Sequence, residues 1–177
     1  ELSKSVCSQL PEEYINMIRL KTGVLLSCAL RLGAVTAHCS KENLELLNEF
    51  ALNIGIAFQI QDDILDCWSD VEVFGKITGK DIIDNKKTFL YLKALEIGSQ
   101  RQQNILQELY SSKNFEPAQK EQVVKSIYED LKIKELGEKE MLHYHNLAIQ
   151  SLEKIDIDNQ RKENLRRFSE KLINRNK

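Results

Sequence analysis

The sequence predicts an all-α fold, and three observations lead to that prediction. Apolar residues recur at steps of three and four along most of the chain, which is the period of an amphipathic α-helix. The 177 residues include only seven glycines and two prolines, few for an all-β protein with many turns. No segment shows a convincing strand pattern. At roughly 150 residues per domain, the length corresponds to one domain or to a piece of a larger one.

Five or six helices are expected. Pro11 and the two acids after it favour a helix start, Ser40 is the expected N-cap of the second helix, and Pro117 favours another start. Gly98 is expected to bend or break the third helix. The predicted helices cover residues 11–38, 41–69, 85–109 and 117–154, with a last helix after a break at 156–159; residues 69–85 are predicted to form a loop.

Composition and charge exclude several classes of protein. The 42% apolar and 29% charged residues are typical of a globular chain and argue against disorder. The net charge of −2 gives no basic field, so no nucleic-acid partner is expected. No run of about 18 apolar residues occurs, so we expect no transmembrane segment.

The cysteines indicate a reducing compartment. Cys7, Cys28, Cys39 and Cys67 are not spaced as CxxC pairs, and Cys28 falls in an apolar helical stretch. We therefore expect four reduced thiols in a cytoplasmic protein. The N-terminus lacks the basic start and apolar core of a signal peptide. It begins at Glu1 without a methionine, which suggests an incomplete chain.

The most informative segment is the acidic end of the second predicted helix. Asp62 and Asp66 are separated by one turn, about 40° apart on one face, with Cβ atoms about 5–6 Å apart. Two like charges in an apolar helix cost stability unless a cation bridges them. Carboxylate oxygens suit Mg²⁺, with Mn²⁺ as an alternative ion, better than zinc. The competing interpretation is a solvated acidic face, although acids in a last helical turn oppose the helix dipole.

Lysines downstream supply the opposite charge. Lys76 lies in the predicted loop, whereas Lys86 and Lys87 are expected in the first turn of the third helix, after an Asp84 or Asn85 cap. A bound phosphate would stabilise cations at that end of the dipole, since helix N-termini bind anions. Lys21 lies within an apolar helix, where it either snorkels to the surface or points toward an anion. Solvated surface lysines are the alternative interpretation.

One ordered set of motifs resembles the trans-isoprenyl diphosphate synthases, which include farnesyl, geranylgeranyl and polyprenyl diphosphate synthases. It consists of Lys21-Thr22, then Phe58-Gln59-x-x-Asp62-Asp63-Ile64-Leu65-Asp66, then Gly75-Lys76, and finally Asp81-Ile82-x-x-Asn85-Lys86-Lys87-Thr88. The match resembles the family's second aspartate-rich motif and its lysine loop. The resemblance implies an isoprenoid-synthase-type helical bundle around a central cavity.

The resemblance also implies roles by position. Asp62 matches the aspartate that binds Mg²⁺ directly, with Asp63 and Asp66 acting through metal or water. The implied diphosphate-binding residues are Lys21, Lys76, Lys86 and Lys87. Thr22 and Gln59 match residues beside the developing carbocation. In the family reaction an allylic diphosphate ionises, isopentenyl diphosphate attacks the cation, and a proton is lost.

The chain departs from the family in lacking an earlier aspartate-rich motif and an upstream basic site. We therefore interpret residues 1–177 as the C-terminal part of a single polyprenyl synthetase domain, inactive when isolated. The family suggests a homodimer. Two alternatives stay open: a non-catalytic subunit or fragment, and a class I terpene cyclase, which the lysine loop disfavours.

Overall fold

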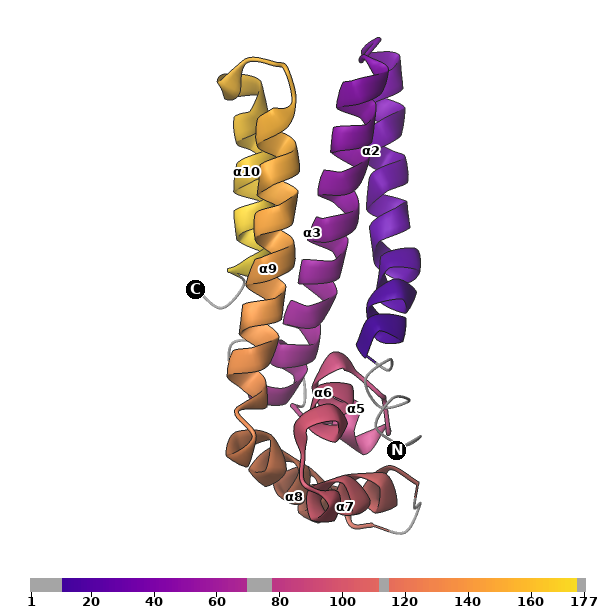
Figure 1. The fold of residues 1–177 in the computed structure, drawn as a ribbon, viewed down its shortest axis with the longest axis vertical. Helices are drawn as coiled ribbons and strands as arrows, with labels where there is room; N and C mark the ends of the chain where they lie inside the picture. The colour runs from indigo at the N-terminus through magenta and orange to yellow at the C-terminus, as the bar shows by residue number, and fades with distance from the viewer. Residues whose placement is uncertain (1–10, 70–77, 112–114, 175–177) are drawn as a thin grey trace. The chain divides into compact units, whose positions relative to one another are not determined.

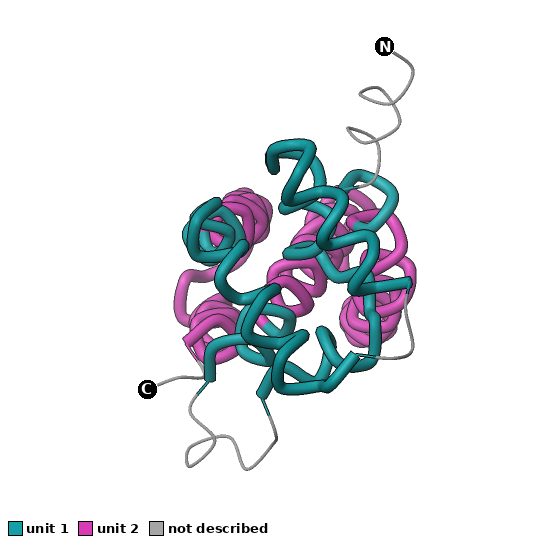
Figure 2. Tube along the Cα trace, turned by 90° about the horizontal axis from the view of Figure 1, so that it is seen from below, with its two compact units in different colours: residues 1–14, 62–138 teal, residues 15–61, 139–177 magenta. Residues whose placement is uncertain are grey.

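The computed structural model describes residues 11–69, 78–111 and 115–174. All regular elements in these ranges are helical, and none of them is a strand (Figure 1). The predicted all-α class is therefore confirmed for the part of the chain that is described. The chain divides into two compact units, shown in Figure 2, and each is considered by itself.

Unit 2 consists of residues 15–61 and 139–177. Its N-terminal helix continues from residue 11 without a break, but changes character at Arg19. The named elements that contribute to unit 2 are the π-helix η1 (Arg19–Gly23), α2 (Val24–Thr36), most of α3 (Lys41–Trp68), most of α9 (Ile133–Lys154) and α10 (Asn159–Ile173). In Figure 1, α2 lies beside α3, and α9 lies beside α10.

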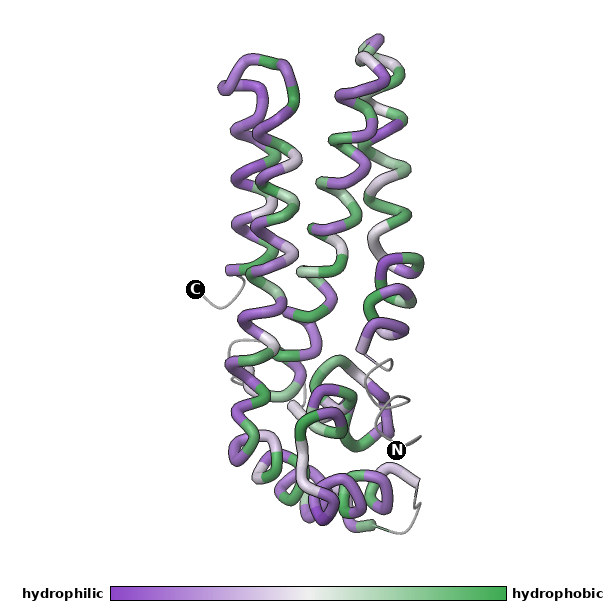
Figure 3. Tube along the Cα trace, viewed as in Figure 1, coloured by the Kyte–Doolittle hydropathy of each residue, from purple (hydrophilic) through white to green (hydrophobic). Residues whose placement is uncertain are grey.

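Apolar side chains from all four long helices form the core of unit 2. Phe50 and Ile54 on α3 pack with Ala148 and Leu152 on α9. Leucines of α2 and α10 pack against this cluster. Figure 3 shows hydrophobic and hydrophilic residues recurring along these helices, the pattern from which the sequence predicts them.

Unit 1 consists of residues 1–14 and 62–138. Besides the ends of α3 and α9, its elements are α5 (Lys80–Ile83), α6 (Phe89–Ile97), α7 (Gln100–Ser111) and α8 (Pro117–Asp130). Three tyrosines join the last three of these helices. The rings of Tyr91 and Tyr110 stack with centroids 4.0 Å apart, and the hydroxyl oxygens of Tyr110 and Tyr128 are 3.4 Å apart.

Several predicted helix ends are confirmed. Ser40 Oγ accepts the Asn43 N–H, Pro117 is the first residue of α8, and α9 and α10 are separated at the predicted break. Gly98 separates α6 from α7. These boundaries depend on local capping chemistry, which the sequence displays.

Three other boundaries were predicted wrongly. The predicted loop contains the one-turn helix α5, and the helix predicted over 117–154 is broken between α8 and α9. Lys132 adopts a left-handed conformation at that break, with φ of 53°. The helix predicted from Asn85 begins only at Phe89, because Asn85 also has a positive φ, of 58°. Lysine gives no sequence signal for a left-handed conformation, and asparagine gives a weaker one than glycine.

Within the described ranges, no helix combines the length and the apolar character needed to cross a membrane.

Candidate active site

Two carboxylates of α3 and one of α5 form an acidic cluster, defined as Asp62, Asp66 and Asp81. One turn of α3 separates the first two, as the sequence predicts. Asp66 Oδ2 accepts the Asp81 backbone N–H at 2.9 Å, and the Asp66 carbonyl accepts the Gly79 N–H at 2.6 Å. These two bonds fix the start of α5 against the end of α3 and bring Asp81 to Asp66.

Lys86 is part of the same arrangement. Its ammonium forms an ion pair with the Asp81 carboxylate, and its backbone N–H donates to the Asp81 carbonyl at 2.9 Å. The hydrogen bond to Asp81 raises the pKa of Lys86. Burial, reinforced by the Asp81 charge, raises the pKa of Asp66. The cluster has three carboxylates, and Lys86 is the one lysine shown paired with it among the described residues, so its acidic groups outnumber its basic ones.

Asp63 is placed differently from Asp62 and Asp66. Its side chain is only 4% exposed, whereas Asp62 is exposed and Asp66 half-buried. Asp63 Oδ2 accepts the Tyr14 hydroxyl at 2.6 Å and the Phe89 N–H at 3.2 Å. Burial raises the pKa of Asp63 to about 7, and burial also raises the pKa of Tyr14, which keeps its hydroxyl a neutral donor. The described contacts of Asp63 are thus with Tyr14 and the backbone of Phe89, whereas the sequence analysis expected this carboxylate to act through metal or water.

The basic turn, residues 84–88 between α5 and α6, differs from the expectation. Lys86 and Lys87 were predicted in the first turn of a helix, and that prediction is wrong, since Thr88 is the N-cap. Both lysines are exposed and precede the helix. Asp63 takes up the Phe89 N–H, which is one of the N–H groups at the start of α6 that we expected a phosphate to bind.

In unit 2, the Lys21-Thr22 pair lies in the π-helical segment η1 rather than in a regular α-helix. The Val24 N–H donates to the Arg19 carbonyl, five residues earlier. Single π-turns inside α-helices occur often at functional sites. Lys21 is exposed and Thr22 is half-buried.

A close approach of two glycines holds η1 against α3. A Cβ added to Gly55 would lie 2.6 Å from the Gly23 Cα, so only glycine fits at that position. One turn further along α3, Gln59 Oε1 accepts the Thr22 hydroxyl at 3.3 Å. The structure thus brings together Thr22 and Gln59, two residues that the sequence analysis grouped.

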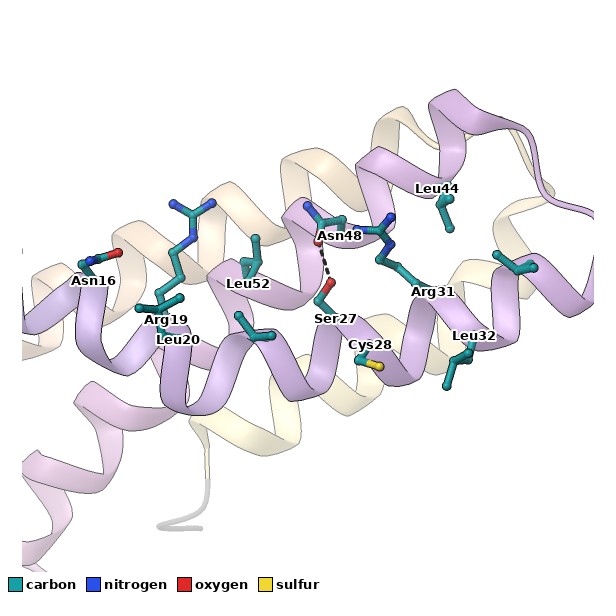
Figure 4. Close-up of a pocket in the computed structure, with 12 residues that line it drawn as sticks. Asn16, Arg19, Leu20, Ser27, Cys28, Arg31, Leu32, Leu44, Asn48 and Leu52 are labelled. Atoms are coloured by element: carbon teal, nitrogen blue, oxygen red, sulfur yellow. Dashed lines mark hydrogen bonds between the residues drawn. The ribbon is translucent and has the colours of Figure 1, made fainter.

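Unit 2 also contains an apolar groove of about 690 Å³ along α2 and α3. Figure 4 shows Ser27 of α2 facing Asn48 of α3, with the serine hydroxyl donating to the amide oxygen. Arg19, Arg31 and several leucines line the rest. Among the described residues, none of those predicted for the site lines this groove.

The acidic cluster fits a divalent cation. Its donors are hard carboxylate oxygens of the kind that Mg²⁺ prefers, and Mg²⁺ needs only one or two protein carboxylates when phosphate and water complete its shell. No set of three acidic, histidine or cysteine side chains converges in metal-binding geometry within residues 11–69, 78–111 and 115–174. Asp62 and Asp66 are the best-placed candidates, because they are the less buried members of the motif.

Three residues that contact the predicted site residues or the basic turn were not predicted from the sequence: Asp81, Tyr14 and Lys120. Asp81 falls inside the quoted motif, and its spacing from Lys86 was the available signal. Tyr14 and Lys120 had no signal, because their contacts with Asp63 and Asn85 join distant parts of the sequence. Lys76, which we predicted to bind diphosphate, lies outside the described residues.

The comparisons with known proteins bear on this arrangement. Residues 2–131 match the sequence model of the Polyprenyl synthetase family. The chain belongs to that family. The resemblance predicted from the motifs is thus confirmed, and the match includes the acidic cluster and the basic turn.

Individual polyprenyl synthetases agree with this assignment. The chain is 42% identical over 121 residues to a short chain isoprenyl diphosphate synthase of Methanocaldococcus jannaschii, an alignment that covers 68% of this chain and 36% of that protein. It is 34% identical over 156 residues to a geranylgeranyl diphosphate synthase of Saccharolobus solfataricus, covering 84% of this chain and 44% of that protein.

A solved geranylgeranyl pyrophosphate synthase has the same fold, with a TM-score of 0.84 and 33% identity. The superposition covers 97% of this chain and 57% of that one. The chain thus spans between about a third and three-fifths of the length of these relatives.

Proposed function

We propose that this chain carries part of the active site of a prenyltransferase that condenses an allylic diphosphate with isopentenyl diphosphate. The single observation that carries the proposal is the acidic cluster with its paired Lys86, in a family whose relatives are named isoprenyl diphosphate synthases. Carboxylates for a metal beside lysines for an anion are the combination that diphosphate chemistry requires.

In this proposal, Asp62 and Asp66 hold Mg²⁺. The ion, when bound, supplies positive charge that stabilises the departing diphosphate. Asp81 supports the site by accepting a hydrogen bond from Lys86, so that this ammonium stays charged near the metal-binding carboxylates. The rise in the pKa of Asp66 reflects a site where carboxylates are crowded and partly buried, which a cation would relieve.

We assign the diphosphate to the lysines. Lys86 and Lys87 are exposed on the basic turn and therefore accessible to an anion. Lys76 is assigned to the same function from the motif alone. Lys21 is exposed on η1 and is also proposed to bind the allylic diphosphate.

Thr22 and Gln59 are proposed to lie beside the developing carbocation. The Thr22 hydroxyl donates to Gln59 Oε1, which leaves hydroxyl lone pairs to face positive charge. The hydrogen bond fixes both side chains in one orientation. For Asp63 we propose a supporting role, because its Oδ2 is bonded to Tyr14 and to the start of α6.

We propose that the protein acts as a homodimer, after the family. The free thiols Cys28, Cys39 and Cys67 support a reducing, cytoplasmic environment.

The test is an Mg²⁺-dependent condensation assay on the whole protein that contains this chain, with product length read by mass spectrometry. Asp62→Asn should lower the rate by about three orders of magnitude, because it removes a metal ligand and its charge. Asp130→Asn is the matched control, since Asp130 is an exposed acid at the end of α8. An Asp62→Asn enzyme as fast as the Asp130→Asn enzyme would refute the role of the acidic cluster.

A further inference from the structure

The basic turn has an irregular backbone that must be held in place. Asn85 adopts a left-handed conformation, with φ of 58°, and this reverses the chain just before Lys86 and Lys87. Backbone hydrogen bonds run from Asn85 N to Ile82 O and from Thr88 N to Lys86 O. Short turns of this kind gain little stability from their own bonds, so their conformation depends on contacts with neighbouring elements.

Lys120 provides such a contact from α8. Its side chain is only 4% exposed, and its ammonium donates a hydrogen bond to Asn85 Oδ1. The ammonium also lies 4.7 Å from the centroid of the Tyr110 ring, within the range of a cation–π interaction. Burying an ammonium costs free energy that an apolar residue would not cost. We therefore attribute the burial of Lys120 to its hydrogen bond with Asn85 and its contact with the Tyr110 ring, which offset this cost.

The other end of the turn is held by Asp63, which accepts the Phe89 N–H. Two buried ionisable residues thus hold the two ends of the basic turn, Lys120 from α8 and Asp63 from α3. The segment between them carries Lys86, which reaches the acidic cluster through Asp81.

We infer that Lys120 is a positioning residue for diphosphate binding: it holds Asn85 in the left-handed conformation and so directs Lys86 and Lys87 toward the anion. This inference rests on the proposed function, because the two lysines bind diphosphate only in that proposal. Lys120 itself does not touch the diphosphate.

The experiment compares Lys120→Met with Lys162→Met in the whole protein. Lys162 is a matched control because it is also a lysine with 4% exposure, and its ammonium donates to a backbone carbonyl, that of Glu153. It belongs to unit 2, whereas the basic turn belongs to unit 1. Both variants remove a buried ammonium and keep an apolar stem, so both should lose similar stability.

Two measurements separate positioning from stability. Hydrogen–deuterium exchange reports on the amides of residues 85–89, and titration calorimetry with magnesium pyrophosphate reports on the anion site. Lys120→Met should raise exchange at these amides about tenfold and weaken pyrophosphate binding about tenfold relative to Lys162→Met, the size expected from losing a charged hydrogen bond. Equal exchange and equal binding in the two variants would overturn the inference.

Substitutions at Asn85 test the same hydrogen bond from its other end. If Lys120→Met does not fold, Asn85→Gly removes the same bond and tolerates the left-handed conformation, and it should have the same two effects. Asn85→Asp keeps an acceptor for Lys120 and should restore both properties toward the wild type. If the wild type binds no pyrophosphate, the proposed function fails, and the exchange measurement alone decides whether Lys120 holds the turn.

Discussion

The two units hold their candidate functional residues by different means. In unit 1, buried polar side chains hold the segment that carries Lys86, with Asp63 bonded to Phe89 N and Lys120 bonded to Asn85. In unit 2, Thr22 meets Gln59 because the backbones of two helices touch at a pair of glycines.

This difference follows from the backbone on each side. The basic turn of unit 1 is irregular, so its N–H groups need acceptors that a helix would supply from its own carbonyls. The residues of unit 2 lie within continuous helices, whose backbone groups are already bonded, and close packing is then sufficient to fix the register. Functional residues beyond the end of a helix are thus expected to be held by hydrogen bonds from side chains, and those within a helix by close packing of the helices.

The largest loss of stability should come from removing the buried carboxylate of Asp63, which accepts two hydrogen bonds in unit 1. Asp63→Ala should lower the free energy of unfolding by about 3 kcal/mol, since Tyr14 and the Phe89 N–H would each lose a partner in a buried site. Urea denaturation followed by circular dichroism measures this loss. Asp63→Asn keeps an oxygen acceptor and should lose less than half as much. An alanine variant as stable as the wild type would mean that unit 1 does not depend on this carboxylate.

A smaller effect is expected from the steric contact of unit 2. Gly55→Ala would place a Cβ 2.6 Å from Gly23 Cα, so η1 must move away from α3. We expect a loss of about 2 kcal/mol from overpacking and a lower condensation rate, because Thr22 would move away from Gln59. Gly33→Ala is the control.

Among the described residues, no atom outside the neighbouring backbone of α2 lies within 4 Å of a Cβ added at Gly33, which is in the last turn of that helix. Gly33→Ala should therefore stabilise the protein by up to about 1 kcal/mol through helix propensity alone. If both alanine variants changed stability in the same direction, close packing would not be what positions η1.

The smallest expected effect is a change of stability with pH, and it concerns the His145 ring of unit 2. His145 Nε2 is buried and has no hydrogen-bond partner among the described residues. Burial lowers the pKa of His145, and the nearby charge of Glu170 opposes this. The folded state then binds a proton less readily than the unfolded state, so stability should fall as pH drops through the ordinary histidine value of about 6.5.

Thermal unfolding at about pH 7.5 and about pH 5.5 tests this linkage, which should amount to less than about 1 kcal/mol. His145→Gln should remove that part of the pH dependence, whereas His143→Gln, which alters an exposed histidine of the same helix, should not. Identical pH profiles for wild type and His145→Gln would show that burial of this ring carries no penalty.

The sequence was sufficient for the features that have a local cause. The helical period predicted the long helices, Ser40 and Pro117 marked helix starts, and the spacing of Asp62 and Asp66 placed both on one face of α3. Each of these depends on residues within one or two turns of each other, which is why pattern reasoning reaches them.

The features that the sequence did not predict have distant causes. The late start of α6 depends on Asn85, whose left-handed conformation is stabilised by Lys120, 35 residues away. The π-turn at η1 has no residue signature, and the burial of Asp63 depends on Tyr14, 49 residues earlier. Tertiary contacts of this kind override local propensity and leave no periodic pattern.

The π-helical segment has a consequence for inherited variation. Since its Val24–Arg19 bond closes over five residues instead of four, η1 contains one residue more than an α-helix would hold in that turn. Loss of a single codon between Arg19 and Gly23 would therefore restore regular α-helical winding and leave residues 15–18 in nearly the same direction relative to α2. Ile18, which is 1% exposed, would stay in the interior. A gene encoding this protein should therefore tolerate the loss of one codon at this turn more readily than within the regular winding of α2, where it would rotate the preceding side chains by about 100°.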